Sequence, residues 1–561
     1  MSDDRTTLTS GGLAPARAPE QEPRPTGIPP VLDDAHIGDI RGALGTIRMH
    51  DTGERHGWRS RLMALLAIMG PGLIVMVGDN DAGGVSTYAQ AGQNYGTTLL
   101  WTLLLLIPVL IVNQEMVVRL GAVTGVGHAR LIFERFGRFW GAFSVGDLLL
   151  LNFLTIVTEF IGVSLALGYF GVSPYIAVPL AALALVAITA SGSFRAWERS
   201  MFVFVFANLL VIPLFFLAHP DGSRIAHDFF VPGIQGGATS TSVLLIIAIV
   251  GTTVAPWQLF FQQSNIIDKR ITPQWINYER VDTWFGAFVV VVGAAALICV
   301  SAFAFEGTQY AGQFTDAGAT AAALEHVLGP PAGAMFALVL LNASLIGAGA
   351  LTLSTSYAFG DMTGAKSSLH RKFSEEPGFY ILFSLVIAGA AGIVLIPGAP
   401  LGIITLAVQA LAGVLLPSAT VFLLLLCNDR AVLGPWRNKP WLNVLAVVIE
   451  AVLLLLSLIL MASTVFPSLD VTTFAVVGAG VMTVVLLVFG AVILLGRRRG
   501  PATAPAPPPS VPRERWTMPP IALLDRPPES TGRRAAMLAM EVYLFVAIVI
   551  LVIKAFQLAG V

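Results

Sequence analysis

The chain contains about thirteen apolar runs, each close to the length that a helix needs to cross a lipid bilayer. Charged residues make up only 12% of the chain and hydrophobic residues 55%, which excludes an ordinary soluble domain. Since only helices and closed barrels span a membrane, the runs predict an all-α membrane protein. They are expected at 62–92, 96–118, 140–168, 173–191, 200–218, 241–265, 283–305, 331–358, 377–396, 400–427, 441–463, 473–495 and 536–558.

The segments outside these runs differ in composition. Residues 1–60 are rich in proline, arginine and aspartate and lack the apolar core of a signal peptide. We expect a disordered cytoplasmic tail there, with a short helix near residues 36–47. Residues 497–534 form a linker rich in proline and alanine, and residues 535–561 hold an additional C-terminal span.

Lysine and arginine residues gather in alternate loops. They follow the second, fourth, sixth, eighth, tenth and twelfth runs, whereas the loop at 306–330 contains none. Because basic loops stay on the cytoplasmic side, we expect a cytoplasmic N-terminus and a C-terminus outside. The chain is expected to be a multi-pass protein of a bacterial plasma membrane, with the lipid bilayer as its surroundings.

The first run is interrupted by the sequence Gly-Asp-Asn-Asp-Ala-Gly-Gly at 78–84. A carboxylate at bilayer depth is costly, and it usually faces a pathway or a partner. Glycines beside Asp79, Asn80 and Asp81 predict a broken helix, which is tolerated at this depth only around an enclosed cavity. Many secondary transporters bind a cation at such a break.

The sixth run carries a matching interruption at 251–256. Pro256 lacks a backbone N–H and predicts a break just before it. Paired breaks in corresponding runs indicate two related halves, and they point to a transport site. We expect a first five-span repeat at 61–218, a second and inverted one at 241–427, and spans eleven and twelve within 428–496.

Several motifs in these runs resemble the NRAMP family of metal-ion transporters, from about residue 65 to 435. Asp81-Ala82-Gly83-Gly84 falls on the family's Asp-Pro-Gly-Asn, and residues 251–258 fall on its Gly-Ala-Thr-Val-Met-Pro-His-Asn. The other matching segments are Gly70-Pro71-Gly72, 119–125, 159–162 and Gln409, which stands eight residues before Pro417. The resemblance implies a LeuT-like fold with an inverted five-plus-five repeat. It also implies alternating access around a site between the two breaks.

The departures from the family bear on the ion. The family holds its metal through the Asp and Asn of span one, a Met sulfur of span six and backbone carbonyls. Here Gly84 takes the Asn position and Ala255 the Met position, so the soft ligand is gone. Hard cations such as Mg²⁺ and Mn²⁺ are therefore favoured, as in the family's magnesium-transporting relatives. The oxygen ligands that remain are Asp81, Thr252, Gln409, backbone carbonyls and either Asp79 or Asn80.

Proton coupling is expected to be weak. Trp257 and Gln262 stand where the family has two histidines, and Ile156 stands at its span-three aspartate. Glu159 is the one matching acid that remains for a proton relay. Gly83 and Pro256 are expected to form the helix breaks, and Trp257 beside them a gate.

Each of these residues also has a simpler structural interpretation. Asp81 serves as a helix cap, Thr252 bonds a carbonyl one turn back, and Gln409 joins two helices. In this interpretation Trp257 only packs against its neighbours, and Asp79 and Asn80 line a cavity. For Glu115, Asp147 and Glu450 we favour structural pairing, with Glu115 next to Arg119 on one helical face.

Other functions remain as alternatives. Conventional proton-coupled Mn²⁺ or Fe²⁺ transport is the first, and an amino-acid transporter of LeuT-like fold is less favoured because Asp81 repels a substrate carboxylate. An ion channel is a further alternative. No motif of an intramembrane enzyme is present. We expect no cofactor besides the transported cation and no nucleic-acid partner, and the sequence specifies no oligomeric state.

Overall fold

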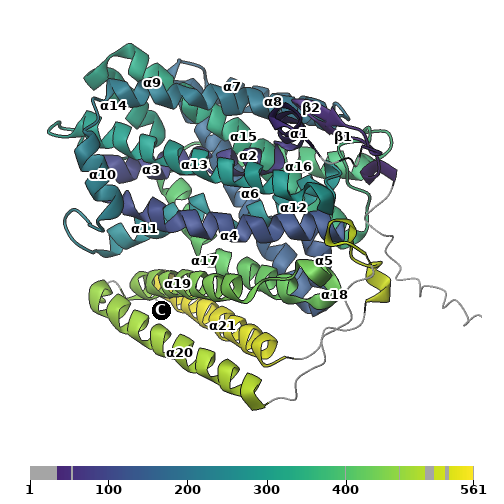
Figure 1. Cartoon of the computed structure of the whole chain (residues 1–561). Coiled ribbons are helices and arrows are strands. Elements are labelled where there is room, and N and C mark those ends of the chain that lie inside the picture. The colour runs from purple at the N-terminus through teal and green to yellow at the C-terminus, as the bar shows by residue number, and fades with distance from the viewer. Residues whose placement is uncertain are drawn as a thin grey trace, which may run out of the picture.

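A computed structural model of the chain describes residues 34–559, apart from 52, 54, 399, 467, 500–510 and 525–529. Within this part of the chain the protein is almost entirely helical, and its long helices run side by side (Figure 1). Ten of the described helical segments are long and apolar enough to cross a membrane, or eleven if a bent pair counts as one span. The expectation of an all-α membrane protein is confirmed.

The helices of the first half follow the expected runs, with short helices between them. They are α1 (Trp58–Ile68), α2 (Pro71–Gly78), α3 (Ala82–Tyr95), α4 (Trp101–Thr124), α5 (His128–Phe136), α6 (Arg138–Tyr169), α7 (Pro174–Thr189), α8 (Phe194–Ala207), α9 (Val211–Leu217) and α10 (Gly222–Phe230). The first expected span is thus built from α2 and α3, while α1 meets α2 at a bend of 54°. The fourth, α7, is a short apolar helix.

The second half and the C-terminal region continue this pattern. Their helices are α11 (Ser240–Thr253), α12 (Pro256–Asp268), α13 (Ile276–Phe305), α14 (Ala317–Leu328), α15 (Pro330–Thr363), α16 (Pro377–Val394), α17 (Leu401–Asn428), α18 (Arg430–Leu433), α19 (Pro440–Val465), α20 (Val471–Arg499) and α21 (Thr531–Ala559). The 3-10 turns are η1 (Asp34–His36), η2 (Asn208–Leu210), η3 (Pro273–Trp275), η4 (Gly434–Trp436), η5 (Arg513–Arg515) and η6 (Ile521–Leu523). Helices α19, α20 and α21 lie along one side of the bundle (Figure 1).

The N-terminal region departs from the expected disordered tail. Residues 1–33 lie outside the described residues, but β1 (Ile40–Gly42) and β2 (Gly45–Ile47) pair as an antiparallel hairpin. The expected helix at 36–47 is therefore wrong. Ile40 and Ile47 are buried, and their burial against the bundle stabilises a hairpin too short to persist alone.

The expected linker at 497–534 is partly folded onto the bundle. Residues 500–510 and 525–529 lie outside the described part, but Met518 is buried and its N–H donates to the Val123 carbonyl at 3.0 Å. Trp516 contacts Gly434 in the turn before α19. The linker thus packs where α4 and α18 end.

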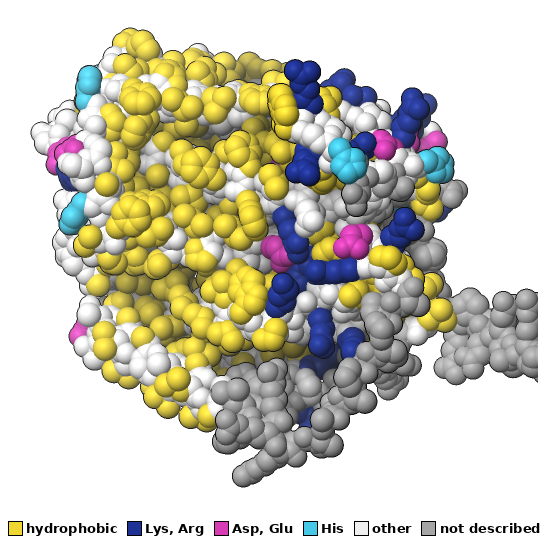
Figure 2. Space-filling view, in the orientation of Figure 1, with side chains coloured by type: hydrophobic (Ala, Val, Ile, Leu, Met, Phe, Trp, Pro, Cys, Tyr) yellow, Lys and Arg dark blue, Asp and Glu magenta, His cyan; other side chains and the backbone are white. Residues whose placement is uncertain are grey.

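Hydrophobic side chains cover most of the visible face, over the middle of the long helices (Figure 2). Lysine and arginine side chains gather at the edge where the hairpin β1–β2 and α5 lie (Figures 1 and 2). Such a division is typical of a protein whose middle faces lipid and whose basic end faces water.

Candidate cation-binding site

The break in the first span lies between Gly78, the last residue of α2, and Ala82, the first residue of α3. Asp81 occupies the N-cap position of α3, and its carboxylate accepts a hydrogen bond from the Gly84 N–H at 2.6 Å. An acidic N-cap satisfies a backbone donor and faces the positive end of the helix. Part of the carboxylate's role is thus to restart the helix.

The break in the sixth span lies between Thr253 and Pro256. Pro256 has no N–H, so the carbonyl of Thr252, four residues earlier, loses its usual helical donor. Val254 and Ala255 are extended or irregular, and Ala255 is the N-cap residue of α12. The sequence therefore leaves the Thr252 carbonyl, in the last turn of α11, without its helical donor.

The two breaks meet at Asp81. The Thr252 hydroxyl lies 3.5 Å from the Asp81 carboxylate oxygen that also accepts from Gly84. A Cβ added to Gly84 would lie 2.7 Å from the Asp79 carbonyl oxygen and 3.1 Å from the Thr252 hydroxyl. The position that carries asparagine in the family therefore has no room here for a longer side chain without backbone movement.

Gln409 of α17 lies next to the start of α3, close to Asp81. A Cβ added to Gly83 would lie 1.7 Å from the Gln409 amide nitrogen, so the amide rests directly on the start of α3. Its nitrogen has no hydrogen-bond partner among the described residues. Asp81, Thr252 and Gln409 are each at most 2% exposed, so the three expected ligands share one enclosed place.

Asp79 is held separately. Its carboxylate accepts a hydrogen bond from the side-chain amide of Gln258 on α12, and Gln258 in turn accepts from Gln114 of α4 at 2.9 Å. The second carboxylate oxygen of Asp79 has no partner among the described residues. Asp79 therefore joins both broken spans and keeps one acceptor unused.

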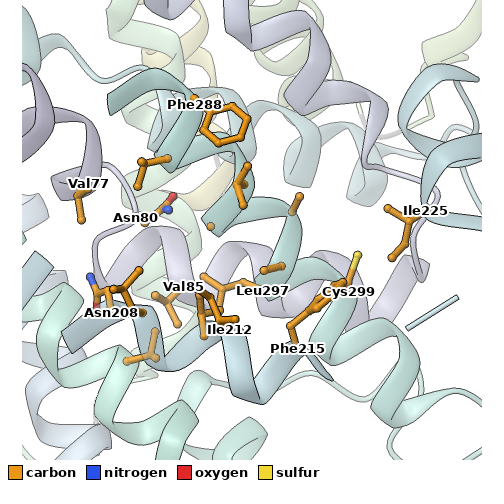
Figure 3. A pocket seen from close by; sticks show the side chains of 18 of the residues that line it. Val77, Asn80, Val85, Asn208, Ile212, Phe215, Ile225, Phe288, Leu297 and Cys299 are labelled. Atoms are coloured by element: carbon orange, nitrogen blue, oxygen red, sulfur yellow. The ribbon is translucent and has the colours of Figure 1, made fainter. Parts of the chain in front are cut away.

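Asn80 is bound to α13. Its amide donates to the Val290 carbonyl of α13 at 3.1 Å. The side chain lines a cavity of about 610 Å³ whose other labelled walls include Val77, Val85 and Leu297 (Figure 3). Nearly all of this lining is apolar, so Asn80 takes the role of cavity lining and the cavity is a poor place for a hydrated cation.

Glu159 of α6 reaches the same break from the other side. Its carboxylate accepts from the Ala82 N–H at 3.1 Å, and it neighbours the carboxyl group of Asp81. Space for it comes from Gly347 of α15, where an added Cβ would lie 2.6 Å from the Glu159 carboxyl group. An acid thus lies beside the expected metal ligand, as a proton relay requires.

Trp257 is fully buried and lies over the end of α2. A Cβ on Gly78 would meet its ring at 3.2 Å, and the Trp257 carbonyl accepts from Ser354 at 3.3 Å. Gln262, at the other family histidine position, donates to Thr283 at 3.0 Å. Both positions are filled by groups that do not titrate near neutral pH.

The chemistry of this place is that of oxygen. It offers the Asp81 carboxylate, the Thr252 hydroxyl, the freed Thr252 carbonyl and the Gln409 amide, with Asp79 nearby. Among the described residues no three His, Cys, Asp or Glu side chains converge as a metal-binding cluster. The arrangement suits a hard cation that keeps some of its waters.

Sequence reasoning missed several partners of the site. Gln258 donates to Asp79 and accepts from Gln114, and the Tyr88 and Thr253 hydroxyls bind each other at 2.7 Å next to the second break. Their signal was weak, because isolated polar residues in apolar runs often serve as interhelical contacts. Glu115 and Arg119 do pair as expected, at 2.7 Å.

The comparisons with known proteins agree on one family. Residues 72–463 match the family described as natural resistance-associated macrophage protein-like. The divalent metal cation transporter MntH of Burkholderia ambifaria is 28% identical over 407 residues, covering 70% of this chain and 87% of that protein. MntH of Bacillus subtilis is 24% identical over 458 residues, covering 79% of this chain and 98% of that protein.

Among solved structures, a manganese transporter from Eremococcus coleocola, crystallised with an aromatic bis-isothiourea substituted compound, has the same fold. The TM-score is 0.61 at 21% identity, covering 82% of this chain and 98% of that one. This likeness confirms the LeuT-like arrangement of two broken spans in a multi-pass membrane protein. Because the matched family region takes in well over half of the sequence, the chain belongs to the natural resistance-associated macrophage protein-like (NRAMP) family of membrane transporters.

Proposed function

We propose that the chain is a secondary transporter of divalent metal cations and not an enzyme, and that it works by alternating access. The observation that carries this proposal is the meeting of two broken spans at one buried carboxylate, Asp81, with Thr252 at 3.5 Å. The relatives named as divalent metal cation transporters support it. The cation is held between the breaks while one repeat rocks against the other.

The ion favoured by this site is hard. The family's methionine sulfur and asparagine amide are both absent, because Ala255 and Gly84 stand at those positions. Oxygen ligands alone favour Mg²⁺ and Mn²⁺ over softer ions, since soft metals gain most from sulfur. Mn²⁺ is the ion named for the structural relative.

Uptake into proteoliposomes tests the site. Asp81→Ala should abolish Mn²⁺ and Mg²⁺ uptake, whereas Asp147→Ala, which removes another intramembrane carboxylate bonded to Ser418, should keep it. Ala255→Met should strengthen competition by Cd²⁺, and Ala255→Leu, with similar bulk and no sulfur, should not. Tight Cd²⁺ transport by the unaltered protein would contradict an oxygen-only site.

Proton coupling is proposed to be weak, because only Glu159 remains of the family's titrating groups at these positions. A pH-sensitive dye inside the vesicles should report little acidification during metal entry. Stoichiometric acidification would instead favour the conventional proton-coupled Mn²⁺ or Fe²⁺ transporter, and Glu159→Gln should then remove it.

The proposed orientation puts the N-terminus and the hairpin β1–β2 in the cytoplasm. The basic side chains gathered at that edge support it (Figure 2). A cysteine introduced at the exposed residue Leu44 should react with a membrane-impermeant reagent only in inside-out vesicles. Labelling of intact cells would reverse the assignment.

A further inference from the structure

The hairpin β1–β2 sits in a close-fitting place at the corner between α1 and α2. A Cβ added to Gly42 would lie 2.1 Å from the Ala67 carbonyl oxygen, and one on Gly45 would lie 2.9 Å from the Ala67 side chain. Ala43 in the turn is buried as well. Two glycines thus allow the hairpin to contact the last turn of α1 through its backbone.

The turn of the hairpin reaches a buried ion pair. The Ala43 N–H donates to the carboxylate of Glu198 on α8, and Arg199 donates to the Ala43 carbonyl at 3.2 Å. The other Glu198 oxygen lies 2.6 Å from the Lys269 ammonium at the end of α12. Both charged side chains are at most 1% exposed.

The same ion pair fixes the corner from which α2 starts. Lys269 donates to the Met69 carbonyl at 2.8 Å. Asp282 of α13 accepts from the N–H groups of Gly70 and Gly72 at 3.0 and 2.7 Å. Gly70 has a φ of 154°, and it forms the bend of 54° between α1 and α2. The hairpin, the ion pair and the start of the broken first span are therefore one connected unit.

The end of the other broken span is attached to the same segment. Arg270, two residues after the end of α12, donates to the Ala35 carbonyl at 2.6 and 2.9 Å and to the Asp39 carbonyl at 3.2 Å. It does so from a left-handed conformation with a φ of 66°, which is unfavourable for a residue with a side chain. One N-terminal segment thus holds the ends of α2 and α12 that lie away from the cation site.

We propose that the hairpin β1–β2 is a latch that positions half-helix α2 and closes the transport pathway on its own side of the membrane. The proposal rests on the proposed transport function. Moving the start of α2 away from α12 and α13 separates the Met69 carbonyl from Lys269 and the Gly70 and Gly72 N–H groups from Asp282. A buried charge that loses such partners is costly until water reaches it. The latch therefore favours the closed state, and release of the hairpin accompanies opening.

Two variants interrupt this unit at different points. Gly42→Val forces the hairpin from its place, because its new Cβ meets a backbone oxygen. Glu198→Gln keeps an oxygen for the Ala43 N–H but removes the charge that faces Lys269. Gly53→Val is the matched control, since a Cβ at Gly53 has no atom within 4 Å.

Hydrogen exchange of the full-length protein in detergent, followed by mass spectrometry, reads the state of α2. Both variants should speed exchange across residues 70–79 by about threefold or more relative to wild type, and Gly53→Val should not. Gly42→Val should also speed exchange at residues 36–48, which shows that the hairpin has left. The apparent KM for Mn²⁺ offered from the opposite side should rise in both, because fewer molecules are then open to that side.

Unchanged exchange at residues 70–79 in Gly42→Val, with faster exchange at 36–48, would overturn the latch. So would an unchanged exchange rate in Glu198→Gln. Absence of both Mn²⁺ and Mg²⁺ uptake by the wild type would instead reject the proposed function, and the exchange measurement would still decide whether the hairpin positions α2.

Discussion

Glycine at position 347 decides where a titratable side chain lies. The Glu159 carboxyl group occupies the space that a side chain at 347 would fill, and from there it binds the Ala82 N–H at the start of α3. A buried carboxyl group that loses such a backbone donor is destabilised, because its oxygen is left unsatisfied away from water. The geometry of the first break therefore depends on a residue of α15 that carries no functional group itself.

Gly347→Ala should displace Glu159 and lower the rate of metal uptake by about tenfold, equivalent to about 1.4 kcal/mol in the transport barrier. Gly349→Ala, two residues along the same helix, is the control, because its Cβ would make an ordinary contact of 3.4 Å with flexible Met201. Initial rates in proteoliposomes at equal protein density check this. Equal rates for the two variants would mean that the position of Glu159 does not affect transport.

At the scale of elements, helix α17 carries Gln409 toward the cation site and contains Pro417 in its interior. Pro417 has no N–H, so the Gly413 carbonyl lacks its helical donor. Ser457 of α19 donates to that carbonyl at 3.2 Å, and Tyr543 of α21 donates to the neighbouring Val414 carbonyl. The additional C-terminal helix thus stabilises the helix that holds Gln409.

Loss of these bonds should destabilise the protein without altering its surface. Ser457→Ala leaves a buried carbonyl unpaired, and Tyr543→Phe removes a buried donor; each should lower the free energy of unfolding by about 1 kcal/mol. Tyr175→Phe, at a tyrosine that is 62% exposed, should have no effect. Thermal unfolding in detergent measures all three, and identical midpoints would show that α21 does not support α17.

The elements that local chemistry dictates could be predicted from the sequence. Glycines around Asp81 and the proline at 256 broke the first and sixth spans where expected. The hairpin could not be predicted, because its strands are stable only against α1 and Glu198, which lie far away in sequence. The position of the Asn80 side chain could not be predicted for the same reason. Its sequence neighbours are residues of the candidate site, but its hydrogen-bond partner is a carbonyl of α13.

At the scale of the whole molecule, the basic end contains buried charged side chains as well as exposed ones. The buried cations at that end pair with carboxylates or carbonyls, as Lys269 does with Glu198 and Arg135 with Asp429 at 2.6 Å. His128, at the start of α5 and outside the spans, differs from them. It is fully buried, its ring nitrogen lies 2.8 Å from the Gln263 amide oxygen, and Phe260 contacts its ring. Burial lowers the pKa of His128 to about 4, which the bond to Gln263 only partly offsets.

This shift links the stability of the whole protein to pH. Above the unfolded pKa of about 6.5, His128 is neutral in both states and its contribution to stability is complete. As pH falls below that value, the unfolded chain binds the proton first, so the free energy of unfolding should drop by about 1.4 kcal/mol per pH unit until the folded pKa of about 4 is reached. Acidification on the side of the membrane where α5 lies should thus loosen the contact between α5 and α12.

Thermal unfolding of wild type, His128→Gln and His50→Gln between pH 7.5 and pH 5 tests this prediction. His128→Gln retains a polar group near Gln263 but no longer titrates, so its midpoint should fall less steeply with acid than that of wild type. His50 is exposed, and its variant should follow wild type. Parallel curves for wild type and His128→Gln would mean that the acid sensitivity of the fold arises from other buried groups.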